Sequence, residues 1–266
     1  MPKKLKVYEI EKEKQVERFY DRIAEGYDAT HGLRVADAIL EHFLIKSLPN
    51  GEKLNILDAG GGIGRFALPL LQKGHKVAVS DISQEMLKSA QKNLARYDEA
   101  SFVKESVTNM TRHKEEEFHV VILMNAILDY CGNHLKALKE AYRVLKKKGR
   151  MIGNVNNRLI YCQNHELIEG KYDEFRKSMS TGNRHIIWAD QKEGHMTHEF
   201  TLKELKRDLE ITGFKIIKIL GPFNLLPKYR LDDINNKEEY IKLQIEYAEL
   251  QEYINNSQDF FFVAEK

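Results

Sequence analysis

The chain has 266 residues, a length that fits one large domain or one domain with insertions. Hydrophobic residues make up 42% and charged residues 31%, and the formal net charge is +2, so no overall basic field indicates a nucleic-acid partner. No apolar run approaches the roughly 20 residues of a membrane span, and Cys131 and Cys162 lack the CxxC spacing of a redox or metal motif. The charged N-terminus lacks the apolar core of a signal peptide, so we expect a cytoplasmic protein with no membrane partner.

Two helices are predicted before the first strand. The first covers residues 7–22, and the second runs from Ala36 to Leu48 and ends near the Pro-Asn-Gly that follows. Phe19, Ile23 and Tyr27 are spaced at i, i+4 and i+8, as on the apolar face of an amphipathic helix.

A glycine-rich turn follows the first predicted strand, Leu54–Asp58, in the sequence LNILDAGGGIGR. Gly60, Gly62 and Gly64 alternate, and a helix is predicted over 63–73, in which we expect Pro69 to remove one hydrogen bond and cause a kink or a tightened turn. Strand, glycine turn and helix are the arrangement by which α/β folds bring backbone N–H groups close to a nucleotide-like ligand. The G-x-G-x-x-G spacing of a dehydrogenase is absent, because the position three after Gly62 is Arg65.

The second predicted strand, 76–80, ends at Asp81, and an acid at this place can accept hydrogen bonds from the two hydroxyls of a ribose. Ser83 is expected to cap a helix that reaches about Arg96. Strands are then predicted over 101–105 and 118–124, and the second of these is a continuous apolar run typical of a parallel sheet buried on both faces.

The remaining core elements continue this alternation. A helix over 134–145, ended by the lysines and glycine of 146–149, precedes a strand over 149–156. A helix over 202–213 is followed by strands over 214–221 and 259–265. Strands that alternate with helices predict an α/β fold with a doubly wound, mostly parallel, seven-stranded sheet.

Two segments exceed this core, residues 157–200 and residues 224–257, and the second contains a predicted amphipathic helix over 240–253. Long insertions in a compact domain are usually functional, so we expect both to form a cap over the carboxyl ends of the strands. The predicted organisation is N-terminal helices at 1–52, an α/β core at 53–156, a cap insertion at 157–200, and a last core part at 201–266 with the cap insertion 224–257.

The pattern D-x-G-x-G-x-G, with Asp81 after the second strand, resembles motif I of the class I S-adenosylmethionine (SAM)-dependent methyltransferases. Tyr20, Ala24, Tyr27 and Asp28 match the F/Y-x-x-x-A-x-x-Y-D segment of the ubiquinone/menaquinone-type members. The resemblance implies a Rossmann-like methyltransferase fold whose last strand runs antiparallel. It also implies SAM as cofactor, S-adenosylhomocysteine as product, and an N-terminal segment that folds over the cofactor with an aromatic ring near the methyl group.

Carried over position by position, the resemblance implies these cofactor-binding residues: Tyr20, Tyr27, Asp58, Gly60, Gly61, Gly62, Gly64, Asp81, Ile82, Met86, Ser106, Val107 and Asn125. Arg34, which precedes the second predicted helix, is a further candidate, as a partner for the carboxylate of SAM. Ser106 and Val107 stand where the family usually has Asp and a small residue at the adenine amino group. Some of these residues have a second interpretation: Arg34 as an exposed side chain, Met86 as a core residue, and the tyrosines as part of a helix face.

Displacement of a methyl group from a sulfonium requires alignment of the acceptor and exclusion of water, and a proton is removed only for some acceptors. The sequence contains no P-loop and no H-E-x-x-H zinc motif, and we expect no metal site. Asp129 and Tyr130, which follow the fourth strand, are candidates for the acceptor side, with a helix cap as the alternative for Asp129. His185 and His198, in the insertion that holds Trp188, are candidates for proton removal, with a solvated loop as the alternative.

The sequence favours a small-molecule acceptor over RNA. Residues 157–200 hold six basic and seven acidic side chains, and residues 224–257 hold four and seven, so the cap is acidic where RNA needs a basic surface. Against this, DAGGG and the segment that ends in Gly170-Lys171-Tyr172-Asp173 are similar to enzymes that methylate the carboxyl group of a modified wobble uridine in tRNA. A protein that binds SAM without catalysis is the third alternative. The acceptor atom and the oligomeric state stay open.

Overall fold

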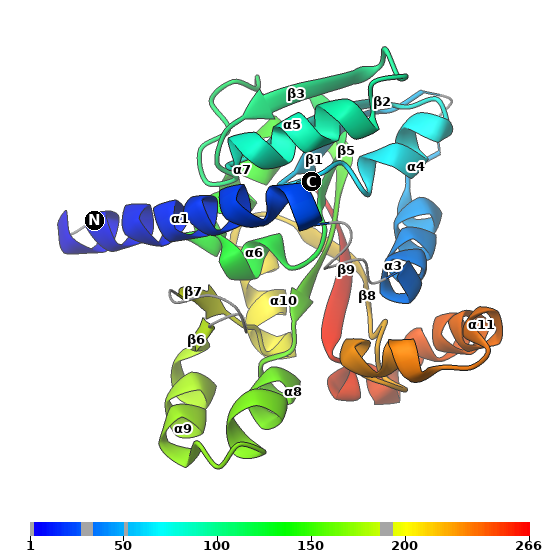
Figure 1. The fold of residues 1–266 in the computed structure, drawn as a ribbon. Helices are drawn as coiled ribbons and strands as arrows, with labels where there is room; N and C mark the ends of the chain where they lie inside the picture. The colour runs from blue at the N-terminus through cyan, green and yellow to red at the C-terminus, as the bar shows by residue number, and fades with distance from the viewer. Residues whose placement is uncertain (1–2, 28–33, 51–52, 187–193) are drawn as a thin grey trace.

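The computed structural model describes residues 3–27, 34–50, 53–186 and 194–266. Within these residues, seven strands form one twisted sheet in the order β3-β2-β1-β4-β5-β9-β8, with helices on both faces (Figure 1). The strands are β1 Asn55–Ala59, β2 Lys76–Asp81, β3 Ala100–Lys104, β4 Phe118–Leu123, β5 Leu145–Asn156, β8 Lys215–Leu220 and β9 Asp259–Glu265.

The predicted doubly wound sheet with an antiparallel last strand is confirmed. β1 to β5 pair in parallel, whereas β9 pairs antiparallel with both β5 and β8. The sequence of β9, DFFFVAE, is rich in aromatic and β-branched residues and is buried from Asp259 to Ala264, as a strand in the middle of a sheet requires.

Alternate residues of the strands belong to two separate cores. Ile56 and Val120 pack under α3 (Arg34–Ser47), α4 (Ala67–Gln72) and α5 (Gln84–Asn93), whereas their neighbours Leu57 and Val121 pack under α7 (His134–Val144) and α10 (Leu202–Ile211). Successive side chains of a strand point to opposite faces, so one apolar run fills both layers. The parallel strands therefore end at a common edge, which is where the functional residues gather.

Two local predictions are wrong. The helix after the glycine turn begins at Ala67 and not at residue 63, so Pro69 lies in its first turn, where a missing N–H costs no helical hydrogen bond. The lysine run does not end a helix: α7 ends at Val144, and Leu145 already pairs with Phe118. The register then shifts to Val120 opposite Arg150, so residues 146–149 form an irregularity within the strand.

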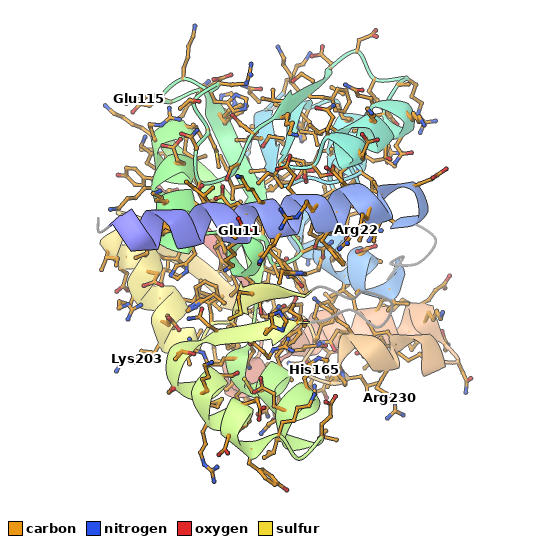
Figure 2. The ribbon with its side chains drawn as sticks, turned by 60° about the vertical axis from the view of Figure 1, so that its left-hand side comes forward. Glu11, Arg22, Glu115, His165, Lys203 and Arg230 are labelled. Carbon is orange, nitrogen blue, oxygen red and sulfur yellow. The ribbon has the colours of Figure 1, made fainter. Side chains whose placement is uncertain are left out.

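The long helix α1 (Lys3–Ile23), continued by η1 (Ala24–Gly26), crosses the molecule between α5 and the hairpin of β6 (Asn183–Ile186) and β7 (His195–His198) (Figure 1). The hairpin belongs to the first insertion, together with α8 (Arg158–Cys162), the π-helical η2 (Gln163–Leu167) and α9 (Tyr172–Thr181). β7 contacts both α1 and the short helix α6 (Ile127–Tyr130), so this insertion lies beside α1 (Figure 2) and adjoins the edge of the sheet.

The second insertion only partly follows the prediction. It forms η3 (Lys228–Asp233), α11 (Lys237–Ala248) and η4 (Gln251–Asn256), so the single helix expected over 240–253 is interrupted after Ala248. α11 packs against α3, and Tyr240 and Ala248 enter the core on that face. Most of this segment therefore extends the core, and η3 brings one of its residues, Lys228, to the edge of the sheet described below.

Candidate functional site

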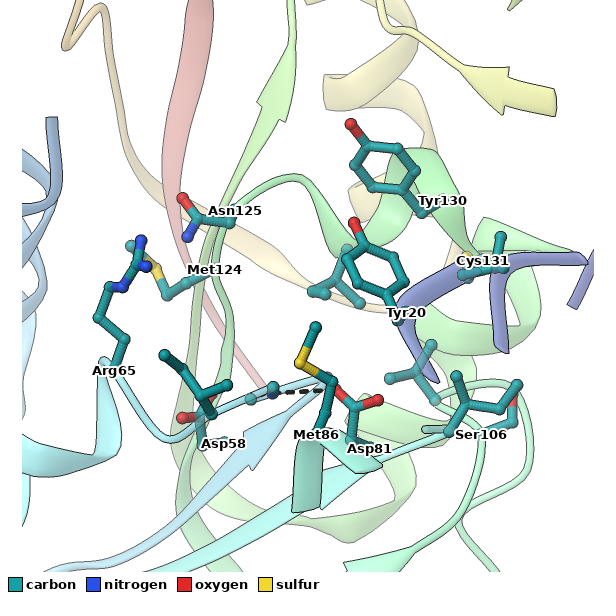
Figure 3. Close-up of a pocket in the computed structure, with 18 of the residues that line it drawn as sticks. Tyr20, Asp58, Arg65, Asp81, Met86, Ser106, Met124, Asn125, Tyr130 and Cys131 are labelled. Atoms are coloured by element: carbon teal, nitrogen blue, oxygen red, sulfur yellow. Dashed lines mark hydrogen bonds between the residues drawn. The ribbon is translucent and has the colours of Figure 1, made fainter. Parts of the chain in front are cut away.

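A pocket of about 920 Å³ opens at the carboxyl ends of β1, β2 and β4, and we call it the cofactor pocket. Figure 3 shows its lining side chains converging from the strand ends, from α1 and from the start of α6. It brings together most of the residues expected to bind the cofactor, namely Tyr20, Tyr27, Asp58, Gly60, Gly61, Gly62, Asp81, Ile82, Met86, Ser106, Val107 and Asn125. Gly64 does not line it and packs its backbone against Leu94 instead.

The glycine turn leaves one open face toward the pocket. Gly60 has φ +75°, and a Cβ there would lie 2.6 Å from Ile127 Cδ1, so packing requires glycine. Gly62 has φ +54°, and a Cβ there would meet no atom within 4 Å. The space beside Gly62 therefore lets a ligand approach the backbone, which is the use of glycine in nucleotide-binding turns.

Asp58 links the end of β1, just before the glycine turn, to the start of α4. Its side chain is buried and accepts a hydrogen bond from the backbone N–H of Ala67, the first residue of α4. Burial, with a smaller contribution from the charge of Asp81, raises the pKa of Asp58 to about 7. Its second oxygen, Oδ2, has no partner among the described residues, so this carboxyl group can still make a bond inside the pocket.

Asp81 is held by backbone donors. Its Oδ2 accepts the N–H of Gly62 at 2.9 Å, and its Oδ1 accepts the N–H of Ser83 at 2.8 Å. Burial raises its pKa to about 6, whereas these backbone hydrogen bonds act in the opposite direction. A carboxylate oxygen can accept more than one hydrogen bond, so both oxygens retain capacity for the hydroxyls of a ribose. The residues present thus fit a nucleoside-containing cofactor.

The far end of the pocket contains an acid that the sequence analysis missed. Ser106 Oγ donates to Glu13 Oε1 at 3.0 Å, and Thr108 Oγ1 donates to the same oxygen at 2.6 Å. Glu13 comes from α1, more than ninety residues earlier in the chain, and lines the pocket itself. The hydroxyl of Ser106, expected to accept a bond from an adenine amino group, instead donates to Glu13 and already accepts the N–H of Thr108 at 3.1 Å. The carboxylate of Glu13, with two oxygens, keeps more acceptor capacity at this end than the hydroxyl does.

The opposite end of the pocket, after β4, has an unusual backbone. Asn125 and Ala126 have φ values of +59° and +63°, a conformation that is uncommon for residues with a Cβ. The N–H of Asn125 donates to Asn154 Oδ1 at 2.8 Å. Strained backbone of this kind persists where surrounding contacts hold it, and it is enriched at functional sites.

A second pocket of about 720 Å³ adjoins this end, and we call it the acceptor pocket because it lies beyond the cofactor pocket on the side of α1 and the cap. It shares five lining residues with the cofactor pocket: Tyr20, Tyr27, Arg65, Asn125 and Tyr130. Phe19, Tyr161, Asn156 and Lys228 line it as well.

The shared wall is aromatic. The ring of Tyr20 lies 6.1 Å from that of Tyr27 and 6.5 Å from that of Tyr130, both in edge contacts. Figure 3 shows the hydroxyl groups of Tyr20 and Tyr130 on the same side. Burial raises the pKa of both phenols well above their ordinary value, so both stay neutral and can donate. Neither hydroxyl has a hydrogen-bond partner in the described part of the chain.

Three residues expected on the acceptor side lie elsewhere. Asp129 is fully buried, lines neither pocket, and accepts the N–H of Asn156 at 2.9 Å. His198 stacks on His134 with ring centroids 4.6 Å apart, and its Nε2 lies 3.1 Å from a carboxylate oxygen of Glu204. His185 lines a separate hollow beside Arg18 and Arg22 of α1.

Another histidine lies closer to the shared wall. His195 packs on Tyr130 and Phe19, with ring centroids 5.5 and 5.2 Å apart. Both of its ring nitrogens are buried without a partner among the described residues, and burial lowers its pKa to about 4. It is therefore a neutral packing group at pH 7.

The side chain of Arg34 and the residues Asp28 and Trp188 lie outside the described part of the chain. Among the residues that the structure describes, no group of three or more His, Cys, Asp or Glu side chains could hold a metal ion. No described helix is both long and apolar enough to cross a membrane.

Comparisons with known proteins agree with this geometry. Residues 56–149 match a family model described as a methyltransferase domain. The chain is 34% identical over 210 residues to a glycine/sarcosine N-methyltransferase of Aphanothece halophytica, covering 72% of this chain and 77% of that protein. It is 27% identical over 187 residues to the tRNA 5-carboxymethoxyuridine methyltransferase of Escherichia coli, covering 65% and 69%.

The fold is also similar to solved structures. One is a SAM-dependent methyltransferase of Thermotoga maritima, described as a possible histamine N-methyltransferase. It has a TM-score of 0.60 at 20% identity and covers 94% of this chain and 99% of that chain. This likeness concerns the fold.

Proposed function

The chain belongs to the class I SAM-dependent methyltransferases, and on that basis we propose that its methyl acceptor is a small molecule bound in the acceptor pocket. The cofactor is SAM, which supplies a methyl group already activated by a positive sulfur. The protein must therefore align the acceptor and exclude water.

The observation that carries the proposal is the pair of adjoining pockets. Tyr20, Asn125 and Tyr130 belong to both, so an acceptor in one pocket meets a cofactor in the other across a shared boundary. The walls of the acceptor pocket combine aromatic rings with polar side chains, as in small-molecule sites. A polynucleotide needs a basic groove, whereas two basic side chains among the described residues line this pocket, Arg65 and Lys228, and each of them is paired with a carboxylate.

We assign the cofactor end as follows. Asp81 accepts the ribose hydroxyls, Ile82 and Met86 pack on the adenine, and Glu13 takes the place of the acidic residue that usually binds its amino group. The neutral hydroxyls of Tyr20 and Tyr130 orient the acceptor. Because Asp129, His185 and His198 line neither pocket, no general base is included in the proposal.

Relatives with both kinds of acceptor exist. One relative is named for glycine and sarcosine, and another for a tRNA uridine. Because of the tRNA methyltransferase relative, methylation of a tRNA is the second candidate function. Residues 157–200, the insertion that adjoins the edge of the sheet, hold more acidic than basic side chains, and this balance favours the small molecule.

The test is turnover with methyl-labelled SAM against a metabolite extract and against total tRNA in parallel. We expect label in the low-molecular-weight fraction and not in tRNA. A Tyr130→Phe variant should bind S-adenosylhomocysteine normally and lose turnover, whereas Tyr172→Phe, an exposed tyrosine of α9, serves as the matched control. Label in tRNA, with a rate that falls steeply as salt rises, would establish the second candidate.

A further inference from the structure

Part of the acceptor pocket is lined by hydrogen-bond donors from segments far from the glycine turn in the sequence. Lys228 of η3 lines this pocket but not the cofactor pocket, and its side chain is 13% exposed. Its Nζ forms an ion pair with Asp259 Oδ2 at 2.5 Å and lies 4.9 Å from the ring centre of Phe223. No other acceptor oxygen contacts it among the described residues, so the ammonium group keeps N–H donors for a ligand.

Two more donors lie beside it. Asn156 is 3% exposed and lines the same pocket, and its side-chain amide makes no hydrogen bond within the described part of the chain. Tyr161 of α8 lines the pocket as well, and its hydroxyl likewise has no partner there. Burial and nearby carboxylates raise the pKa of Tyr161 well above its ordinary value, so the phenol stays a donor. The amide and the phenol therefore border the acceptor pocket with N–H and O–H donors that a ligand can use.

The ammonium group is fixed by the sheet. Asp259, at the start of β9, is fully buried, and its Oδ2 also accepts Asn154 Nδ2 at 2.7 Å. Asn154 in turn receives the N–H of Asn125, so a single buried chain of contacts joins Lys228 to the turn at the end of β4. The backbone N–H of Lys228 is anchored too, on Gln258 Oε1 at 2.6 Å. The donors therefore have set positions before a ligand binds.

Among the described residues, the other cation that lines the acceptor pocket is Arg65, which is part of an ion pair within the pocket. Arg65 forms an ion pair with Asp37 at 2.9 Å, and both line the acceptor pocket. Asp129 of α6 lines neither pocket, and burial raises the pKa of its carboxyl group well above its ordinary value.

We propose that the acceptor carries a carboxylate and that Lys228, Asn156 and Tyr161 bind it. This inference rests on the proposed function, because it assigns the far end of the same acceptor. A planar carboxylate has two oxygens that accept several hydrogen bonds, which matches an ammonium, an amide and a phenol at one end of an aromatic pocket. The nucleophile then lies toward Asn125 and Tyr130, where the two pockets meet.

The test measures binding without turnover. Calorimetry on enzyme saturated with S-adenosylhomocysteine compares benzoate with benzamide, which match in size and differ in charge. We expect wild type to prefer benzoate by about 10- to 100-fold, and Lys228→Met to lose that preference. Lys228→Arg should keep most of it, because the positive charge is retained. S-adenosylhomocysteine itself should bind all three proteins within two-fold.

Lys228→Met leaves Asp259 without its partner, so the double variant Lys228→Met/Asp259→Asn keeps the site neutral if the single variant does not fold. The proposal would be overturned if Lys228→Met or the double variant preferred benzoate as strongly as wild type does. It would also be overturned if benzoate failed to bind wild type. Weaker binding of S-adenosylhomocysteine in Lys228→Met would assign the lysine to the cofactor instead. Label transfer to neutral small acceptors, with no benzoate binding, would reject this inference and leave the proposed function standing.

Discussion

The backbone N–H of Asn125 and the side chain of Asn154 are joined by a hydrogen bond of 2.8 Å, which links the left-handed turn after β4 to the neighbouring strand β5. Asn154 is fully buried in β5, which pairs with β9 in the middle of the sheet. A rigid strand therefore fixes the position of the turn. The boundary between the two pockets is thus set by a side chain that lines neither of them.

Replacing Asn154 tests this support. Asn154→Ala leaves the N–H of Asn125 and one bond of Asp259 unsatisfied, and we expect a loss of roughly 2–4 kcal/mol in the free energy of unfolding. Denaturant unfolding measures it, with Asn256→Ala, at an exposed position, as a control expected within about 0.5 kcal/mol of wild type. Turnover should fall more than the affinity for S-adenosylhomocysteine. Equal stability of the two variants would contradict the assigned role.

Asp81 is expected to contribute strongly to cofactor affinity. Asp81→Ala removes charge-assisted bonds to the ribose and should weaken S-adenosylhomocysteine binding by roughly 1.5–3 kcal/mol, measured by calorimetry. Glu85→Ala, on the exposed side of α5 where Glu85 pairs with Lys88, is the matched control. Unchanged affinity in Asp81→Ala would remove Asp81 from the binding site.

Cofactor affinity should also depend on pH through the same residue. Burial raises the pKa of Asp81 from 3.8 to about 6. Ionisation of Asp81 therefore lowers the free energy of unfolding as the pH rises from about 4 to 6. Ribose hydroxyls bind the ionised form, and affinity should therefore fall as the pH falls through 6. Calorimetry from pH 5 to 8 tests this, and Asp81→Asn should show a flatter profile over the same range, because only the titration of Asp58 remains in the pocket. A wild-type profile as flat as that of the variant would argue against ionised Asp81 as the acceptor.

The first helix is expected to be stabilised by the cofactor. Glu13, Val16 and Tyr20 of α1 line the cofactor pocket, so a ligand there contacts the helix directly. Hydrogen exchange with and without S-adenosylhomocysteine should show slower exchange over residues 12–27 in the complex. α11 lines neither pocket and should exchange equally in both states. Equal exchange of residues 12–27 would rule out a lid ordered by the ligand.

His195 should make the protein less stable in acid. Its pKa is lowered from 6.5 to about 4, chiefly by burial, so the unfolded chain takes up this proton at a higher pH than the folded one. The stability it contributes is full above about pH 6.5 and is lost as the pH falls toward 4, by at most about 3 kcal/mol. His195→Phe should lessen this dependence when urea unfolding is compared at pH 4.5 and 7.5. The same dependence in both proteins would contradict the assignment.

The residues of the local motifs lie together in the structure, as their sequence pattern predicted. Strand, glycine turn and acid are defined by a few adjacent residues, so Asp58, Gly62 and Asp81 could be expected at one strand edge before any contact was known. The tyrosines of the N-terminal segment were expected near the cofactor and line its pocket. The cap of α5 was expected too, and Ser83 Oγ accepts the N–H of Met86 at 3.1 Å.

Contacts between distant segments could not be read in this way. Glu13 reaches Ser106 across 93 positions, and Asn154 reaches Asp259 across 105. Neither residue has a local pattern that separates it from any other polar residue. His185 and His198 were predicted as proton acceptors because an imidazole can remove a proton near neutral pH. The residue type alone does not give the position, and His198 lines neither pocket and is hydrogen-bonded to Glu204. The second insertion, expected to cover the site, instead buries Tyr240 against α3.

The position of β9 has a consequence for the order in which the enzyme is made. This strand is the last of those described to leave the ribosome, yet it inserts between β5 and β8 and carries Asp259. Residues 55–130, which supply most of the nucleoside-binding edge, emerge long before it and can pair among themselves. Until β9 arrives, β5 and β8 present open edges that another chain can pair with, and Lys228 has no counter-ion. We therefore expect the nascent chain to form the nucleoside-binding edge before the contacts of Lys228 exist, and to be most prone to aggregate in that interval.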